Sequence, residues 1–267
     1  MKQGKLGENN KMKKFLLGTV ALVVLAAPAF AADLPARTYT KAPVMVSPVY
    51  DWSGFYIGIN AGGASSHECL TINSVAGGTI APASEGCHNA TGAVVGGQAG
   101  YRWQMTNWVF GLEAQGDWAN LRGSNSSLTA IIPYTNQTKV DAIGLFTGQI
   151  GYAFNNVLLY VKGGAAVTDN KYTSFFPVGN IFAAAGVPFN TASDTRWGGA
   201  VGTGIEIGFA PNWSVAVEYD HLFMGNPNIT FPQSNIAVTR SDNIRQDVDM
   251  GTVRVNYRFG GPVVAKY

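Results

Sequence analysis

The sequence has few charged residues and few cysteines for its length. Only 13% of its 267 residues are Asp, Glu, Lys or Arg, and two are cysteines. After residue 31 it also lacks an apolar run of the roughly 20 residues that a membrane-spanning helix requires. This low charge content, combined with 33 glycines and 12% aromatic residues, is unusual for a soluble enzyme. The chain also lacks Lys/Arg clusters after residue 31, which argues against a nucleic-acid partner.

The N-terminal segment has the features of a secretory signal peptide. Lysines precede an apolar run at 15–27, and the small residues Ala29 and Ala31 follow, so cleavage is expected before Ala32. The true start is either Met1 or Met12, because both are followed by basic residues. Removing residues 1–31 takes five lysines and one glutamate, so 18 basic and 16 acidic residues become 13 and 15, a net charge of −2.

After this segment and a proline-containing stretch, apolar and polar residues alternate with a period of two. This is the pattern of a β-strand with one apolar face. Eight segments show it, each near or above the 9–11 residues that a tilted membrane strand needs. They lie around residues 55–62, 91–102, 108–118, 140–152, 157–165, 195–209, 213–220 and 252–259.

The connections between these segments alternate strictly between long and short. The long connections are 64–90, 119–138, 169–193 and 223–244, and the short ones are 103–107, 154–156 and 210–212. Such alternation places all short turns at one end of a barrel, as in outer-membrane barrels with periplasmic turns and extracellular loops. We therefore predict an all-β fold, an eight-stranded antiparallel transmembrane β-barrel at 52–260. An extended periplasmic leader at 32–51 precedes it, and a short tail at 261–267 follows.

The two faces of the strands differ in charge. One carries charges of both signs among glycines, and the other carries large apolar residues with no charge across its middle. A soluble lipocalin-like barrel would turn that apolar band toward water, so we expect it to face lipid and the charges to fill a narrow interior. A charge-filled interior predicts a plugged barrel and not a wide pore. The predicted interior network is Arg102, Glu113, Asp117, Lys162, Glu206, Glu218, Asp220, Arg254 and Arg258.

A glycine, an aromatic residue, a short polar turn and an apolar alternation recur as GYRWQMTNW, GYAFNNVLLY and GFAPNWSVAV. Each occurrence predicts a hairpin at one membrane interface, where aromatic rings tolerate both acyl chains and headgroups. The predicted aromatic girdle on the apolar face is Tyr101, Trp108, Tyr152, Phe209, Trp213, Tyr257 and Phe259.

The segments FLLGTVALVVLAAPAFAADLPAR, DWSGFYIGINAGG, GYAFNNVLLYVKGG and VNYRFGGPVVAKY carry a family resemblance. The chain resembles the small opacity-type outer-membrane proteins of alphaproteobacteria, the surface-antigen and haem-binding-protein group with an outer-membrane β-barrel domain. The resemblance spans essentially the whole chain and is weakest in the long loops. It implies an eight-stranded barrel with roles in envelope integrity or host contact and no catalytic residues. Because GGPVVAKY follows the last strand, either Phe259 or Tyr267 is the terminal aromatic residue.

Cys69 and Cys87 lie in the first long loop of an exported chain, so we predict a disulfide between them. It would contribute about 3 kcal/mol in the chain-entropy model. The neighbouring His67 and His88 leave open a metal or haem site made of two imidazoles. An oxidised cysteine pair offers no thiolate ligand, so two exposed histidines beside a disulfide are the favoured interpretation.

Asp220, His221 and Ser214 form a hydrolase-like set in sequence, and a barrel enzyme could act on lipid at its rim. A catalytic triad requires side chains that converge on one face. The alternation places Ser214 and Asp220 on the inner face and His221 on the other, so we predict no catalytic residues.

We therefore predict a non-enzymatic outer-membrane protein with a structural, envelope-integrity role and surface-exposed loops. Haem or host-ligand binding through the loop at 64–90 and a lipopolysaccharide-modifying enzyme are the alternatives. Expected partners are outer-membrane lipid and lipopolysaccharide, a host or surface ligand at the long loops, and the barrel-assembly machinery. No cofactor or metal is predicted, and localisation is the outer membrane of a Gram-negative bacterium.

Overall fold

The computed structural model describes residues 50–128, 133–180, 184–232 and 239–260. The predicted signal peptide at 1–31, nearly all of the leader and the tail at 261–267, with Tyr267, lie outside these residues. In the described ranges no helix has the length and apolar character needed to cross a membrane.

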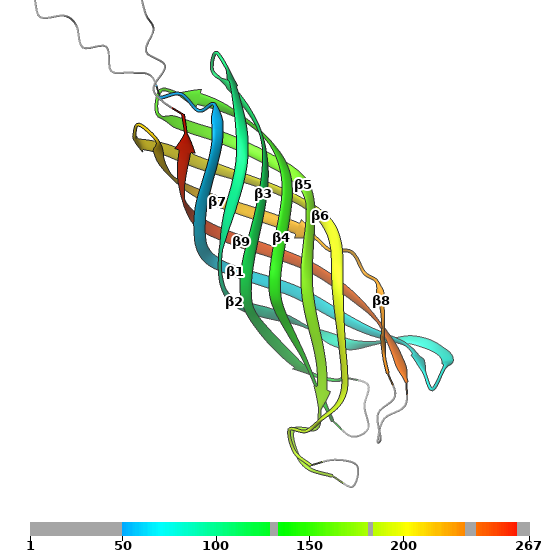
Figure 1. Ribbon diagram of the computed structural model, residues 1–267. Helices are drawn as coiled ribbons and strands as arrows, with labels where there is room; N and C mark the ends of the chain where they lie inside the picture. Colours follow the sequence, from blue (N-terminus) through cyan, green and yellow to red (C-terminus); the bar gives the residue numbers. More distant parts are fainter. Residues whose placement is uncertain (1–49, 129–132, 181–183, 233–238, 261–267) are drawn as a thin grey trace, which may run out of the picture. The chain divides into compact units, whose positions relative to one another are not determined.

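The regular elements in the described part of the chain are β-strands (Figure 1). They are β1 (Gly54–Val75), β2 (Gly78–Met105), β3 (Trp108–Ser126), β4 (Thr135–Phe154), β5 (Val157–Phe175), β6 (Pro188–Ala210), β7 (Trp213–Phe223), β8 (Asn228–Phe231) and β9 (Arg240–Phe259).

The strands form one closed antiparallel sheet. Each strand from β1 to β6 pairs with the next along the chain, and β9 pairs with β1 from Phe55↔Phe259 to Val75↔Arg240. Figure 1 shows β9 in red beside β1 in blue. Both β7 and β8 pair with β9, so together they fill one place in the ring, interrupted at 224–227. The ring therefore has eight places, which confirms the predicted fold class.

The expected limits of the long loops are wrong, because most of these residues continue the strands. β1 and β2 stay paired up to Val75↔Gly78, which leaves Ala76-Gly77 as the turn inside the predicted loop at 64–90. β4 and β5 likewise pair as far as Thr135↔Phe175. In these extensions polar residues occupy both faces, as with Ser65 and Ser66, so the apolar period disappears while the backbone pairing persists.

The opposite end of the barrel has two-residue turns. They are Thr106-Asn107, Asn155-Asn156 and Pro211-Asn212, and they lie at the end where β1 begins and β9 finishes. Thr106 (φ 56°) and Asn155 (φ 55°) adopt left-handed backbone conformations at the first turn position. Asn tolerates this conformation well, whereas a β-branched residue such as Thr rarely adopts it.

An uninterrupted belt of large apolar side chains covers the outer face near the short-turn end. Ile59 is 69% exposed and Leu112 is 61% exposed, values that would be costly in water. Trp118 (76%) and Trp197 (63%) lie at the margin of the belt that is nearest the long hairpins. Other members are Phe55, Ile57, Val95, Phe110, Phe146, Ile150, Leu159, Val161, Val201, Ile205, Val217 and Val253.

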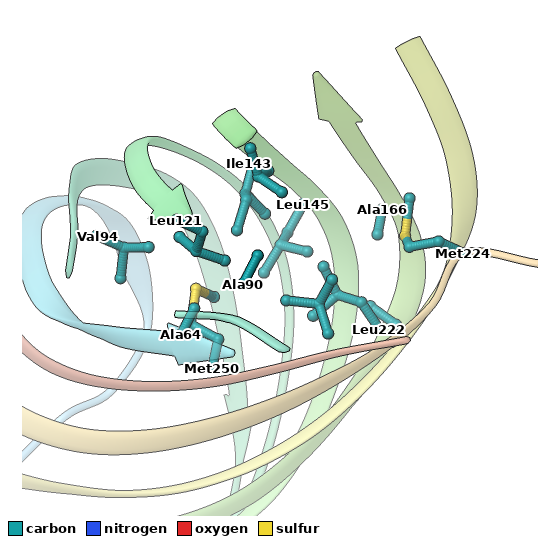
Figure 2. Packing of buried hydrophobic residues seen from close by; sticks show 13 residues of the cluster. Ala64, Ala90, Val94, Leu121, Ile143, Leu145, Ala166, Leu222, Met224 and Met250 are labelled. Atoms are coloured by element: carbon teal, nitrogen blue, oxygen red, sulfur yellow. The ribbon is translucent and has the colours of Figure 1, made fainter. Parts of the chain in front are cut away.

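The interior is arranged in layers along the barrel. Next to the short turns a cluster around Trp52 contains Leu158, an apolar residue on the otherwise polar inner face. The charged side chains follow, and beyond them, toward the long hairpins, lies an apolar layer with residues from eight strands (Figure 2). The order can be read along β9, where Arg254 is followed toward the long hairpins by Met250 and Val248 of this layer. The layer consists of Ala64, Ala90, Val94, Leu121, Val140, Ile143, Leu145, Ala166, Ala200, Leu222, Met224, Val248 and Met250.

Candidate functional sites in the interior and at the long hairpins

Arg254 lies at the centre of the interior charge network. Its Nη2 atom donates to Glu113 Oε2 at 2.5 Å, and its Nη1 atom donates to Glu218. Lys162 Nζ lies 2.7 Å from Glu218 Oε1 and 3.2 Å from Asp220 Oδ1. These residues come from β3, β5, β7 and β9, so the network ties opposite sides of the ring together. Buried charges are tolerated only when they are paired in this way.

A second ion pair and two phenols extend the network. Arg102 Nη2 lies 2.7 Å from Glu206 Oε2. The Tyr56 hydroxyl donates to Glu113 Oε2 at 2.5 Å, and the Tyr160 hydroxyl donates to Glu218 Oε2 at 2.6 Å. We did not predict the two tyrosines as network members, although their position on the polar face of their strands was a usable signal.

The remaining predicted interior residues, Asp117 and Arg258, also face the barrel interior, but they do not belong to the cluster around Arg254. Asp117 is buried and accepts a hydrogen bond from Gln115 Nε2 at 2.8 Å. A Cβ on Gly96 would lie 2.1 Å from Asp117 Oδ1, so the glycine leaves room for this carboxylate. Arg258 lies at the short-turn end, where it donates to the carbonyls of Ser53 at 3.1 Å and Pro211 at 3.2 Å.

The seven predicted girdle residues lie on the outer face beside the short turns. Trp108 packs edge-on against Tyr152 with ring centroids 5.3 Å apart. Tyr257 lies between Trp213, at 5.0 Å, and Phe259, at 5.1 Å. Tyr101 and Phe209 are also exposed at this end. Sequence reasoning missed further aromatic residues at the same level, namely Phe55, Trp103 and Phe154.

The two cysteines form a disulfide between directly paired positions of β1 and β2, with a Cα–Cα distance of 4.1 Å. The bridge therefore crosses a hairpin and does not close a free loop. His67 lies exposed on the outer face, where its Nδ1 atom is 2.6 Å from Asn89 Oδ1. His88 is buried inside the barrel, 3.1 Å from Thr138 Oγ1 through Nε2, and burial lowers its pKa. The two imidazoles point to opposite sides of the sheet, so the hypothesis of a two-imidazole metal or haem site is wrong. The prediction of two exposed histidines is correct for His67 and wrong for His88.

The hydrolase-like set is not assembled. Ser214 donates to Glu206 near the short-turn end. Asp220 faces Lys162 inside the barrel. His221 lies on the outer face with Nδ1 2.7 Å from Asp249 Oδ1.

A second buried polar cluster lies within the long hairpins, beyond the apolar layer. Arg240 Nη2 contacts Asp242 Oδ2 at 2.7 Å, and its Nη1 lies 3.6 Å from Glu85 Oε2. Burial raises the pKa of Asp242 to about 7 despite the opposing effect of Arg240, and the nearby Glu85 carboxylate raises it further. Burial also raises the pKa of Glu68, whose Oε1 accepts a hydrogen bond from Ser66 Oγ at 3.0 Å.

The described residues thus form a closed barrel with a filled interior, an apolar outer belt and a ring of aromatic residues at one end. The family described as "Outer membrane protein beta-barrel domain" matches residues 17–259. The chain belongs to this family of outer-membrane β-barrel proteins. The match covers most of the chain and confirms the resemblance stated from the sequence.

Two related outer-membrane proteins agree with the family. The 31 kDa outer-membrane immunogenic protein of Brucella melitensis biotype 1 is 30% identical over 254 residues, covering 93% of this chain and all of the relative. The 25 kDa outer-membrane immunogenic protein of Brucella abortus biovar 1 is 25% identical, covering 93% and 99%. Among solved structures, Neisserial surface protein A is 15% identical with a TM-score of 0.35, covering 78% of this chain and 98% of its own.

Proposed function

We propose that this outer-membrane barrel protein is a closed, non-enzymatic anchor that stabilises the cell envelope and displays its long hairpins at the cell surface. The observation that carries the proposal is the filled interior, in which the charge network is followed along the barrel by the apolar layer. Figure 2 shows the residues of this layer. A narrow barrel filled by side chains provides no route for sizeable solutes.

The proposed orientation follows the usual arrangement of outer-membrane barrels, which place short turns in the periplasm and long connections outside. The predicted aromatic girdle would then lie at the periplasmic interface. The end of β9 at Phe259 would be the terminal aromatic residue offered to the barrel-assembly machinery.

Two measurements test this function. A purified, refolded barrel should give no steady single-channel currents in planar bilayers, and a reproducible open channel would contradict the closed-anchor proposal. In cells, deletion of the gene should increase sensitivity to detergents. A variant that lacks residues 65–88 should restore resistance, because Ala64 pairs with Gly92 and the join leaves a three-residue turn.

Binding of a host or surface ligand through the first hairpin is a second candidate function. The Cys69–Cys87 disulfide supports it, because the bridge orders a hairpin that projects beyond the apolar belt. The variant lacking residues 65–88 separates the two functions. It should lose ligand or host-cell binding while keeping heat-modifiable mobility on detergent gels and envelope resistance.

The enzyme alternative has its own test. His221→Ala should leave the lipid A species of the cell unchanged by mass spectrometry. Loss of a modified species in this variant, with normal amounts of folded protein, would contradict the non-enzymatic assignment.

A further inference from the structure

Three basic side chains lie side by side on the outer face of neighbouring strands. Arg122 on β3 pairs with Lys139 on β4, and Lys139 pairs with Lys171 on β5. We call these residues the basic row. An outward face that is apolar over most of its length therefore carries three adjacent cations at one level.

On these strands the basic row lies next to the apolar belt, on the side of the long hairpins. Trp118 precedes Arg122 by four positions on β3, and Trp197 pairs with Val167 four positions before Lys171 on β5. The level at which a barrel surface changes from apolar to charged is the level of the lipid headgroups. The row is therefore positioned to meet headgroups and not acyl chains.

An open groove lies on the lipid-facing wall, on the short-turn side of the basic row. It has a volume of about 460 Å³ and is lined on the outer face by Trp118, Ala142, Val167 and two glycines, Gly116 and Gly144. A Cβ added at Gly116 would meet no atom within 4 Å, so the floor of the groove is empty space. Asp169 and Thr195 line the end of the groove that is nearest the basic row. The shape and apolar character fit a hydrocarbon chain.

Asp141 directs the two lysines toward the groove. Lys171 Nζ lies 2.7 Å from Asp141 Oδ2, and Lys139 contacts the other oxygen. Asp141 adjoins the groove residue Ala142 in the chain, and Lys171 lies two positions beyond the groove residue Asp169, so the two lysines lie next to the groove. Their side chains remain 56% and 37% exposed, which leaves N–H donors free for another anion. The three cations of the basic row lie near two carboxylates, those of Asp141 and Asp169, so the site has a net charge of +1.

We propose that this groove and the basic row bind one phosphorylated glycolipid of the outer leaflet, the lipid A part of lipopolysaccharide. A headgroup phosphate contacts Lys139 and Lys171, Arg122 supplies the adjoining positive charge, and an acyl chain lies against Trp118 and Gly116. The site deepens the proposed membrane function and rests on its orientation, because only the outer leaflet offers this lipid to the long-hairpin end. The charge is complementary, and the groove continues directly into the belt that contacts lipid.

The headgroup contact is tested by titrating the purified protein in detergent with bis-phosphorylated lipid A and measuring retained lipid by native mass spectrometry. The double variant Lys139→Gln/Lys171→Gln should bind about tenfold more weakly or worse, because it loses two of the three cations that attract the headgroup phosphates. Arg245→Gln is the matched control, because Arg245 is an exposed, outward cation on β9 beside Asp247. It should bind like the wild type. Equal affinity in the double variant and the wild type would overturn the proposal.

The acyl-chain contact is tested by filling the groove. Gly116→Val should weaken lipid A binding severalfold, whereas Gly251→Val should not. A Cβ at Gly251 also meets no atom within 4 Å, but this glycine lies on β9, away from the groove. Equal losses in the two variants would contradict the groove assignment.

The lipid class is tested with two further probes, dephosphorylated lipid A and phosphatidylglycerol. Tight binding of phosphatidylglycerol would overturn the choice of a glycolipid, and undiminished binding of dephosphorylated lipid A would overturn the phosphate contact. These titrations use purified protein and do not depend on orientation in cells. If protease instead cleaves the long hairpins only from the periplasmic side, the proposed function fails while the titration still reports on the groove.

Discussion

At the short turns, the backbone conformation of a single residue should affect the free energy of unfolding. Thr106 and Asn155 occupy equivalent left-handed positions in two of these turns, but only Asn155 is a residue type that suits the position. We expect Thr106→Asn to raise the free energy of unfolding by on the order of 1 kcal/mol and Asn155→Thr to lower it by a similar amount. Urea unfolding in detergent micelles measures both. Shifts of the same sign in the two variants would contradict this explanation.

Asp242 is the residue for which pH should matter most within the long hairpins. Its pKa of about 7 lies above the usual 3.8, so between these values the folded protein holds a proton that the unfolded chain has released. The free energy of unfolding therefore falls as pH rises through this window, and the loss is complete above about pH 7. Asp242→Asn should remove this loss and stabilise the hairpins at pH 8 by up to about 4 kcal/mol, at about 1.4 kcal/mol per pKa unit.

The measurement is the pH dependence of amide hydrogen exchange in β9 and its neighbours. Glu85 stays 3.6 Å from Arg240 in this variant, so the arginine retains a carboxylate neighbour. Asp247→Asn, on the outward face of the same strand, controls for removing one negative charge. A variant Asp242→Asn with the same pH profile as the wild type would rule out this role.

At the scale of elements, the disulfide should matter for the first hairpin and not for the barrel. The double variant Cys69→Ser/Cys87→Ser removes a cross-link between residues 18 positions apart, worth about 3 kcal/mol in the chain-entropy model. Limited proteolysis should then cut between residues 70 and 86 faster than in the wild type. Heat-modifiable mobility of the uncut protein should be unchanged. Wild-type protein treated with a thiol reductant should behave like the variant, and resistance of both to cleavage would contradict the prediction.

The elements also show where sequence reasoning is informative. Within the membrane belt, lipid outside and charge inside force a strict alternation, and strands such as β3 and β7 could be located from it. Beyond the belt the outer face is polar because it meets water, while the interior mixes polar side chains such as Glu68 with apolar ones such as Leu70. The alternation of polarity then vanishes although backbone pairing continues, so the strand extensions and β8 were not predicted.

At the scale of the whole molecule, the interior network should dominate stability. Lys162→Met leaves Glu218 and Asp220 buried with less positive charge, and we expect it to lower the free energy of unfolding by about 3–5 kcal/mol. Lys171→Met changes an exposed lysine of the same strand and should leave the free energy of unfolding nearly unchanged. Urea unfolding followed by tryptophan fluorescence measures both, and similar costs for the two lysines would contradict the importance of the network.

The sequence by itself determined the fold class, the apolar band on the outer face and the set of charges for the interior. It could do so because a membrane barrel imposes one apolar face on the part of every strand that crosses the lipid and, within that part, allows charges only inside. Tertiary structure alone decided which charges pair, that an apolar layer lies above them, and that His67 and His88 point apart. Ion pairing, layering and the basic row depend on register between strands distant in sequence, and the alternation within one strand carries no information about register.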